Sequence, residues 1–213
     1  MSFQTVEPVL EAAEPSFKIP TRPQMPGPVV DRIAAHLADA CCYLEYGSGS
    51  TTRMAARLRV PFVYSVESNP AYARSVRRAV QHDRKGTEVH VITIDIGEIS
   101  TFGYPLDKSS CAQWSNYPNA IWRRLTQAGL TPDLVLIDGR FRVACFLTTL
   151  LQARPGTTVL FDDYAGREDR YGCVETYLQP DSLVERMAVF TVPDELPVRS
   201  IVLDLAKFYM DPR

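Results

Sequence analysis

Residues 41–52 read CCYLEYGSGSTT, an apolar run that leads straight into two closely spaced glycines. The apolar run at 41–45 predicts a short buried strand. Gly47 and Gly49 allow the chain to turn sharply after that strand and let a ligand approach the backbone closely. A helical pattern follows at 52–58. Strand, glycine turn and helix together predict one unit of an α/β sheet.

The same alternation of strand and helix continues on both sides of this stretch. The expected strands are short and apolar on both faces, which is typical of parallel strands covered by helices on both sides of a sheet. We expect parallel strands at 41–45, 62–67, 89–94, 133–137 and 157–161. Helical patterns occupy 29–40, 52–58, 70–82, 118–128, 143–153 and 173–178. Two last apolar runs, at 187–192 and 200–205, predict a closing antiparallel hairpin.

Two segments interrupt this alternation. Residues 1–28 contain six prolines, and proline does not fit the interior of a long helix or a central strand. We therefore expect an irregular N-terminal arm at 1–28 and a single domain at 29–213. A second irregular segment lies at 97–115, and loops of that length inside a compact domain are usually functional or mobile.

Composition and charge exclude several classes of protein. The chain of 213 residues has a net charge of −2, and without a basic surplus we expect no nucleic-acid partner. No run approaches the ~18 apolar residues of a membrane span, and the N-terminal pattern leads us to expect no signal peptide. Five cysteines without a CxxC spacing indicate free thiols in a reducing compartment. We expect a cytoplasmic protein that does not bind a membrane, with its oligomeric state open.

An acidic residue ends, or directly follows, each of the five expected parallel strands. Right-handed crossovers place the carboxyl ends of such strands at one edge of the sheet, where ligands bind. Each acid alone has a plain structural explanation, such as a helix cap, a turn or a solvated strand end. Together at one buried edge they cost free energy unless something binds them, which favours a ligand site. The acids are Glu45, Glu67, Asp95, Asp138 and the pair Asp162 and Asp163.

The glycine turn and Glu67 also fit a dinucleotide-binding fold, in which a carboxylate about 20 residues after the turn binds a ribose. That fold carries the fingerprint GxGxxG, and here Thr52 occupies the third glycine position. A closing hairpin is also unusual for it. A nucleotide-binding oxidoreductase is therefore the weaker interpretation.

From 29 to 205 the chain resembles the class I S-adenosylmethionine-dependent methyltransferases, through the acid and glycines after the first strand and the acid that ends the second. The resemblance implies a Rossmann-like α/β fold with a mostly parallel seven-stranded sheet and a C-terminal antiparallel hairpin. It implies S-adenosylmethionine as the cofactor. The family's usual third loop glycine is Ser50 or Thr51 here. By resemblance, Glu45, Gly47 and Gly49 would hold the methionine part, Glu67 the ribose, and Asp95 would lie near the adenine.

A narrower resemblance concerns the fourth and fifth strands. LIDG at 136–139, VLFDDY at 159–164 and YGC at 171–173 are similar to segments of the magnesium-dependent sugar O-methyltransferases of the macrocin type. A hard divalent cation prefers carboxylate oxygens and would lower the pKa of an acceptor hydroxyl. The resemblance implies Mg²⁺ bound by Asp138, Asp162 and Asp163.

Arg140 and Arg142 directly follow Asp138, and they offer an alternative to the metal. Neighbouring carboxylates repel one another unless a cation or arginines intervene, so the two arginines could neutralise the aspartates and exclude a metal. We favour this metal-free arrangement. In either arrangement we expect Asp138 and Asp163 to be the catalytic residues, since the three histidines fall on elements away from this edge.

Four arginines belong to loops at this edge of the sheet. Arginine is suited to bidentate recognition of carboxylate or phosphate, so these residues could bind an anionic acceptor. They could equally be surface residues that pair with Glu168 and Asp169. The four are Arg140, Arg142, Arg167 and Arg170.

The sequence therefore predicts an S-adenosylmethionine-dependent methyltransferase that acts on a small-molecule acceptor, at oxygen rather than nitrogen. The alternative is a methyltransferase-like domain that binds the cofactor or a protein without transferring a methyl group, because no side chain is an obvious general base. A fold resemblance does not identify the acceptor.

Overall fold

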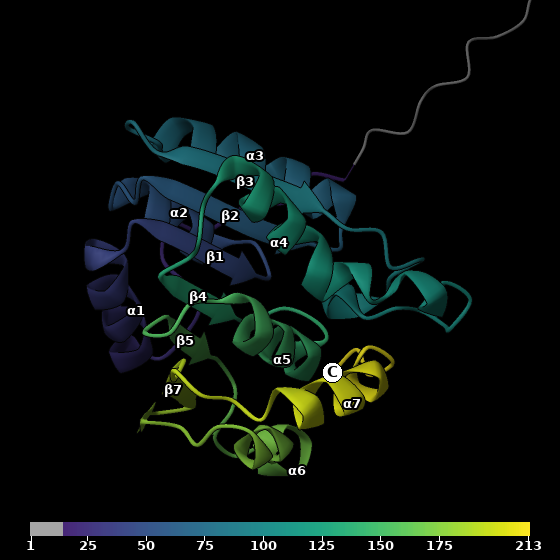
Figure 1. The fold of residues 1–213 in the computed structure, drawn as a ribbon. Coiled ribbons are helices and arrows are strands. Elements are labelled where there is room, and N and C mark those ends of the chain that lie inside the picture. The colour runs from purple at the N-terminus through teal and green to yellow at the C-terminus, as the bar shows by residue number, and fades with distance from the viewer. Residues whose placement is uncertain (1–14) are drawn as a thin grey trace, which may run out of the picture.

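The computed structural model describes residues 15–213, which form one seven-stranded sheet with helices on both faces (Figure 1). The strand order is β3-β2-β1-β4-β5-β7-β6. Strands β1 to β5 are parallel, and β7 and β6 are added antiparallel at one edge. This topology confirms the expected fold class. The strands are β1 (Cys42–Tyr46), β2 (Phe62–Glu67), β3 (Glu88–Thr93), β4 (Leu134–Ile137), β5 (Thr158–Phe161), β6 (Ser182–Val184) and β7 (Met187–Thr191).

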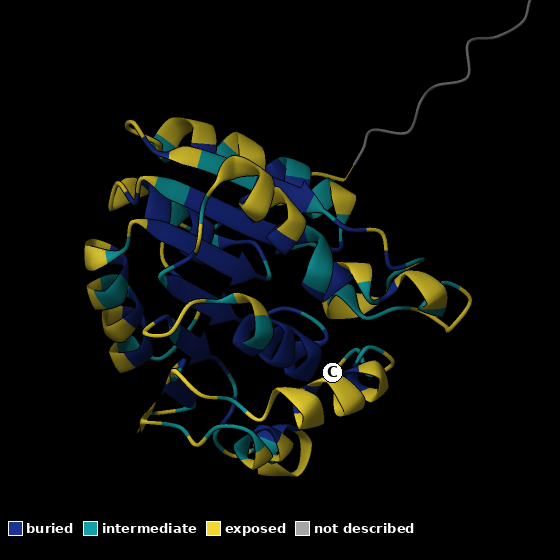
Figure 2. Cartoon of the chain, viewed as in Figure 1, coloured by how far each residue is buried: buried dark blue, intermediate teal, exposed yellow. Residues whose placement is uncertain are grey.

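The sheet sends alternate side chains into two apolar layers. Along β1, Leu44 and Tyr46 face the layer that holds α4, α5 and α7, while Tyr43 faces the layer of α1 and α2. Helix α3 packs beside α2. Figure 2 shows the buried sheet between helices whose outer sides are exposed. The helices are α1 (Gly27–Asp39), α2 (Ser50–Arg57), α3 (Pro70–Asp83), α4 (Asn116–Ala128), α5 (Arg142–Gln152), α6 (Glu168–Tyr171) and α7 (Val198–Phe208).

Local caps set where helices begin and end. Asn69 accepts hydrogen bonds of 3.0 Å from the backbone N–H groups of Ala71 and Tyr72. Pro70 occupies the first turn of α3, where proline removes no helical hydrogen bond. Helix α4 ends at Ala128 and is capped by Gly129, whose φ of +68° is a left-handed conformation that suits glycine. Asn69 follows the carboxyl end of β2 closely, so its cap fixes the start of α3 beside the ligand edge of the sheet.

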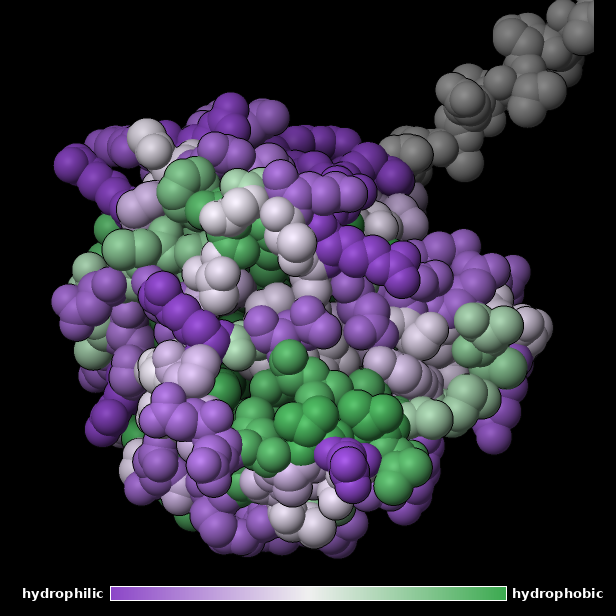
Figure 3. Space-filling view, viewed as in Figure 1, coloured by the Kyte–Doolittle hydropathy of each residue, from purple (hydrophilic) through white to green (hydrophobic). Residues whose placement is uncertain are grey.

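The strand predicted at 200–205 is wrong, because this segment lies within α7. Ile201, Leu205 and Phe208 are buried on one side of that helix, with the spacing of four and three residues that a helix requires. The opposite side is also apolar, with Val202 and Leu203 exposed, and Figure 3 shows an apolar patch over α5 and α7. When a run is apolar on every side, its hydrophobic pattern does not distinguish a strand from a helix.

A closing antiparallel hairpin is confirmed, but β7 pairs with β6 and not with the segment at 200–205. Strand β6 pairs with β7 through a tight turn at Glu185, whose φ is +52°. Only three residues long and with Leu183 55% exposed, β6 carries too weak an apolar pattern to stand out in the sequence. In place of the helix expected at 173–178 the structure has a 3₁₀ helix at Gly172–Thr176, which directly follows α6.

Residues 17–25, here called the N-terminal strap, pack across α2 and α3. Phe17 donates its backbone N–H to Ser75 Oγ at 3.1 Å. Its ring packs edge-on against the ring of Tyr72, with 5.4 Å between the ring centres. Ile19 is buried, and its carbonyl accepts a 2.6 Å hydrogen bond from Arg53. The expected arm thus packs over the domain where it is described, while residues 1–14 of it lie outside the described part. A boundary between arm and domain at residue 28 stays a prediction. Among residues 15–213, no helix is long and apolar enough to cross a membrane.

Candidate active site

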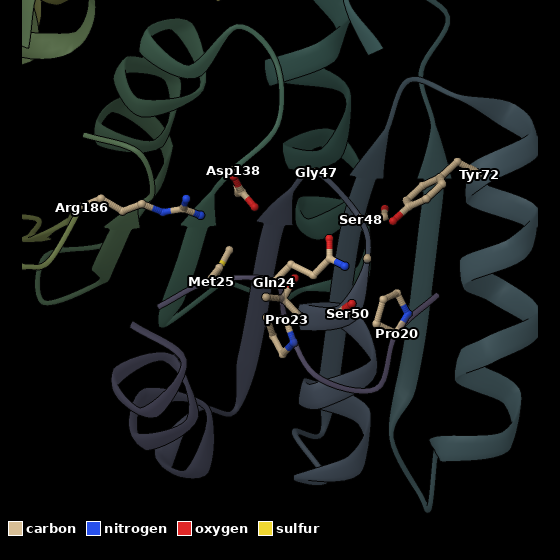
Figure 4. Close-up of a pocket in the computed structure, with 12 residues that line it drawn as sticks. Pro20, Pro23, Gln24, Met25, Gly47, Ser48, Ser50, Tyr72, Asp138 and Arg186 are labelled. Carbon is tan, nitrogen blue, oxygen red and sulfur yellow. The ribbon is translucent and has the colours of Figure 1, made fainter. Parts of the chain in front are cut away.

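A cavity of about 180 Å³ lies at the carboxyl edge of the sheet, beyond the ends of β1 and β4 (Figure 4). The glycine turn after β1 forms its floor, and the N-terminal strap forms one wall. Residues from the N-terminal strap and from the turn between β6 and β7 therefore meet at one site. The lining residues are Pro20, Pro23, Gln24, Met25, Gly47, Ser48, Gly49, Ser50, Thr51, Tyr72, Asp138 and Arg186.

The two glycines of the turn have different roles. Gly47 has a φ of +97°, and a Cβ there would lie 2.8 Å from the backbone nitrogen of Gly139 and 2.9 Å from the carbonyl oxygen of Asp138. Gly47 therefore lets the loops after β1 and β4 pack backbone against backbone. Gly49 is extended, and a Cβ there would lie 3.5 Å from the Tyr72 hydroxyl. Gly49 keeps space open in the cavity.

Glu45 is fully buried below this turn and does not line the cavity. Burial raises the pKa of its carboxyl group, and four hydroxyl donors oppose that shift by stabilising the carboxylate. Two of them belong to the first turn of α2, so Glu45 fixes the start of that helix under the glycine turn. A direct contact of Glu45 with a cofactor stays a prediction. The donors are Thr51 at 2.6 Å, Ser65 at 2.7 Å, Tyr43 at 2.9 Å, and Thr52.

Glu67 and Asp95 lie at the expected edge but outside the cavity lining. Oε1 of Glu67 accepts backbone hydrogen bonds from Ser68 at 2.8 Å and Asn69 at 2.9 Å, while burial raises the pKa of this carboxyl group. Asp95 is exposed and accepts a 2.8 Å hydrogen bond from the backbone of Gly97. Their roles toward ribose and adenine stay predictions.

Asp138, Asp162 and Asp163 converge as the sequence predicts. One carboxylate oxygen from each lies within 4.8 Å of the others, because β4 and β5 are neighbours in the sheet. Asp163 has a φ of +57°, a left-handed conformation that is uncommon outside glycine. This backbone turn directs the chain away from β5 directly after the buried Asp162.

Arginine side chains surround the three aspartates. Arg142 is almost fully buried, with its side chain 4% exposed, and its guanidinium group lies 3.1 Å from Asp138 and 3.5 Å from Asp163. It also donates to the carbonyl of Asp162 at 2.6 Å. Arg167 lies 3.2 Å from Asp163. Of the two arginines expected to pair with the aspartates, Arg142 does so and Arg140 does not, and Arg167 adds a further ion pair.

Arg186 completes this cluster, and sequence reasoning missed it. Its Nε and Nη2 donate to the two carboxylate oxygens of Asp162 at 3.1 and 2.8 Å, and its Nη1 lies 3.2 Å from Asp163. The Arg186 carbonyl accepts the backbone N–H groups of Tyr164 and Ala165, which ties the β6–β7 turn to the end of β5. In the sequence, Asp162 was the one indication that such a partner exists, because a carboxylate buried at a strand end requires a partner.

We call this group of six side chains the Asp–Arg cluster: Asp138, Asp162, Asp163, Arg142, Arg167 and Arg186. Its three carboxylates face three guanidinium groups, so the charges balance without a cation. A divalent cation would have to displace Arg186 from a fully buried carboxylate with both oxygens already paired. The donor set therefore fits ion pairs better than a magnesium site, and metal binding by the three aspartates stays untested.

Asp138 has the least partnered carboxylate of the three and the only one that lines the cavity. Burial raises its pKa from 3.8 to about 7, with repulsion from Asp162 and Asp163 adding to the shift and Arg142 opposing it. Its side chain is 30% exposed, so a molecule in the cavity can reach it. A carboxylate with a pKa near neutrality is suited to accept a proton.

The remaining predicted arginines lie apart from the cluster. Arg170 is half exposed and lies 4.0 Å from Asp169, which matches the surface pairing that the sequence left open. Arg140 stacks on the ring of Tyr104, with its guanidinium carbon 4.0 Å from the ring centre. Tyr104 belongs to the loop at 97–115, so that loop reaches the edge beside β4.

Comparisons with known proteins found similar solved structures. The chain is 36% identical to a methyltransferase-like protein from Silicibacter pomeroyi, over 91% of this chain and all of that one, with a TM-score of 0.81. An RNA methyltransferase from Salinibacter ruber in complex with S-adenosylhomocysteine is 22% identical, over 81% and 95% of the two chains, with a TM-score of 0.47. The TDP-rhamnose 3′-O-methyltransferase of calicheamicin biosynthesis is 11% identical over 77% of each chain, with a TM-score of 0.50, and shares the fold. No protein-family model and no curated protein matches the chain.

Proposed function

This chain belongs to the class I S-adenosylmethionine-dependent methyltransferase family, and we propose that it transfers the methyl group to a hydroxyl oxygen of a small molecule. The observation that carries this proposal is the cavity that joins the glycine turn to Asp138. In the proposal, the turn holds the methionine part of the cofactor and Asp138 faces the acceptor.

The glycine turn is suited to the methionine part of the cofactor. Gly49 leaves open space above the first turn of α2, and the backbone N–H groups of that turn are available to an anionic group such as the methionine carboxylate. Glu45 supports this turn from below through Thr51 and Thr52. Glu67 is proposed to bind the ribose hydroxyls through the carboxylate oxygen that does not accept from Ser68 and Asn69.

Asp138 is proposed as the general base. Methyl transfer to a hydroxyl oxygen requires loss of the hydroxyl proton, and a base with a pKa near the working pH accepts it well. With a pKa of about 7, part of the Asp138 population is ionised at neutral pH. Arg142, 3.1 Å away, fixes the orientation of the carboxylate and stabilises its charge.

Asp163 is proposed as a positioning residue rather than a second base. Its two oxygens lie 3.2 to 3.5 Å from three guanidinium groups, and Asp163 does not line the cavity. It holds Arg142, and through Arg142 it holds Asp138. The rate enhancement would then come from alignment of acceptor and methyl group in a site that excludes water. No step of this proposal passes through a metal ion.

The test begins with calorimetry, using S-adenosylhomocysteine and NAD as separate titrants. We expect a single site for S-adenosylhomocysteine and no heat with NAD. Methyl transfer from labelled S-adenosylmethionine is then measured against a panel of hydroxylated and aminated small molecules, with Asp138→Asn as the control. Turnover on hydroxyls that Asp138→Asn removes supports the proposal. Binding without turnover on any acceptor favours the non-catalytic domain, and binding of NAD alone overturns both.

A further inference from the structure

Arg140 is the one arginine of the four predicted at this edge whose guanidinium group has no polar partner. Among residues 15–213, no hydrogen bond or ion pair reaches it, whereas Arg142 and Arg167 pair with the Asp–Arg cluster and Arg170 with Asp169. Its Nη1 is buried and unpaired. A buried donor without a partner is destabilising, and more so when it carries a charge. The structure therefore holds a cationic donor where no acceptor of the chain satisfies it.

Neighbouring groups fix Arg140 in this place. Its backbone N–H donates to the hydroxyl of Tyr117 at 3.3 Å, and its carbonyl accepts from the Cys145 thiol at 3.4 Å. The ring of Tyr104 covers one face of the guanidinium group at 4.0 Å. A stacked ring leaves the N–H groups in the guanidinium plane free, which is the direction in which carboxylate and phosphate oxygens bind.

Tyr104 is itself held at this edge. Its carbonyl accepts a 2.7 Å hydrogen bond from the backbone of Ser100, so the loop closes on itself in front of the ring. Gly103, the residue before it, touches the end of β2, because a Cβ there would lie 2.9 Å from Ser68 Oγ. The base of the loop is anchored by Trp114, whose indole N–H donates to the carbonyl of Ile96 at 2.9 Å. The loop at 97–115 therefore bridges the ends of β2 and β4.

Arg140 follows the proposed base Asp138 by two residues in the same β4–α5 loop. Its Nη1 is the buried nitrogen, and among residues 15–213 Nε and Nη2 have no hydrogen-bond partner either. These two nitrogens form a fork that matches two oxygens of one anionic group.

We propose that Arg140 and Tyr104 form a subsite for a carboxylate or phosphate group of the acceptor, which makes the substrate a hydroxylated small-molecule anion. The proposal rests on the proposed function for the identity of the acceptor. Arg140 does not itself line the cavity of about 180 Å³. In the proposal, the acceptor extends from Arg140 along the β4–α5 loop to Asp138, which accepts the proton of its hydroxyl. The distance between anion and hydroxyl on the substrate then determines which molecules react.

The test measures anion binding directly, before any substrate is known. Inorganic phosphate and acetate are titrated at constant ionic strength, and the melting temperature is followed for wild type, Arg140→Gln and Arg170→Gln. Arg170→Gln is the matched control because it removes the same charge from the same edge. We expect a saturable rise in melting temperature in wild type and Arg170→Gln, with at least a tenfold weaker apparent affinity in Arg140→Gln. A stronger response to phosphate identifies a phosphorylated acceptor, and a stronger response to acetate a carboxylated one.

Two further variants keep the result clear if Arg140→Gln does not fold. Arg140→Lys keeps the charge but lacks the fork, so we expect intermediate affinity. Tyr104→Ala removes the ring that covers the guanidinium group, so we expect a weaker apparent affinity than in wild type. An equal response in the Arg140 variants, or no saturable response in wild type, overturns the subsite. S-adenosylhomocysteine binding is measured on the same samples. If wild type does not bind S-adenosylhomocysteine, that result counts against the proposed function rather than against the subsite.

Discussion

Arg186 donates two hydrogen bonds of 3.1 and 2.8 Å to the carboxylate of Asp162. They cross the junction where the parallel part of the sheet meets the antiparallel hairpin. Asp162 is fully buried, while the Arg186 side chain is 36% exposed. The ion pair therefore connects the surface turn between β6 and β7 to the innermost carboxylate of the Asp–Arg cluster.

Replacing Arg186 should destabilise the fold. Arg186→Leu leaves Asp162 buried without its partner, and breaking a buried pair from one side costs about 3 kcal/mol or more. Because Arg186 is partly exposed, we expect a loss near the lower end of that range, measured by urea denaturation at neutral pH. Arg170→Leu is the control and should change stability by less than about 0.5 kcal/mol. A loss for Arg186→Leu as small as that of the control would show that Asp162 does not depend on this arginine.

Divalent cations should leave the melting temperature unchanged. The three carboxylates already face three guanidinium groups, so a cation must displace an arginine before it binds. Magnesium, calcium and manganese are titrated in a thermal-shift assay, with chelator as the reference. Stabilisation by a metal that Asp163→Asn removes would reverse this expectation and support the macrocin-type metal site.

Stability should fall as pH rises through the pKa of Asp138. The folded state raises this pKa from 3.8 to about 7, so the folded protein holds the proton more tightly than the unfolded chain does. The stabilisation is fully present below about pH 4 and is lost as pH rises towards 7. Urea denaturation of wild type and Asp138→Asn across this range isolates the effect. We expect the stability of wild type to decline relative to Asp138→Asn, and parallel curves would exclude the raised pKa.

Loss of the Glu67 carboxylate should weaken cofactor binding. Glu67→Ala removes a charge-assisted hydrogen bond worth about 1.5–3 kcal/mol, which corresponds to an affinity for S-adenosylhomocysteine about tenfold to a hundredfold lower. Calorimetry measures it, with Glu98→Ala as a matched removal of an exposed acid near the same edge. Glu67→Gln keeps an oxygen that accepts from the backbone of Ser68 and Asn69 but removes the charge. It therefore separates the structural role of Glu67 in this loop from its role in cofactor binding. Unchanged affinity in a folded Glu67→Ala protein would remove the ribose assignment.

The two loop glycines should respond differently to valine. Gly47→Val pushes a side chain into the backbone of Asp138 and Gly139 at a position with φ of +97°, so we expect a large loss of stability. Gly49→Val fits its extended backbone but fills the cavity beside Tyr72. It should melt close to wild type and bind S-adenosylhomocysteine at least tenfold more weakly. Normal binding by Gly49→Val would place the cofactor elsewhere.

The sequence predicted the elements whose pattern is local. Strands β1 to β5 and their terminal acids follow from short apolar runs bounded by turns, and this was enough to place Asp138, Asp162 and Asp163 together. Helix α7 was misread because its sequence is apolar on both sides, and the short, exposed β6 has almost no pattern of its own.

Contacts between distant segments could not be predicted in this way. Arg186 pairs with Asp162 only because a surface turn folds over the end of β5, and nothing near Arg186 in the sequence marks it as a site residue. The orientation of Glu45, away from the cavity and towards four hydroxyl groups, depends equally on the packing of α2 and β2. Acid positions at strand ends were predictable, but the direction of each carboxylate was not.

The N-terminal strap has a consequence for the order in which the protein is made on the ribosome. The strap is synthesised before every strand, yet its contacts are with α2 and α3, which emerge later. Domains generally begin to fold from their N-terminal part during translation. The strap therefore has no partner to pack against until α3 has been synthesised. Arg186, the last residue along the chain that lines the cavity, emerges later still. A nascent chain can therefore retain a small molecule in the complete site only after Arg186 has emerged from the ribosome.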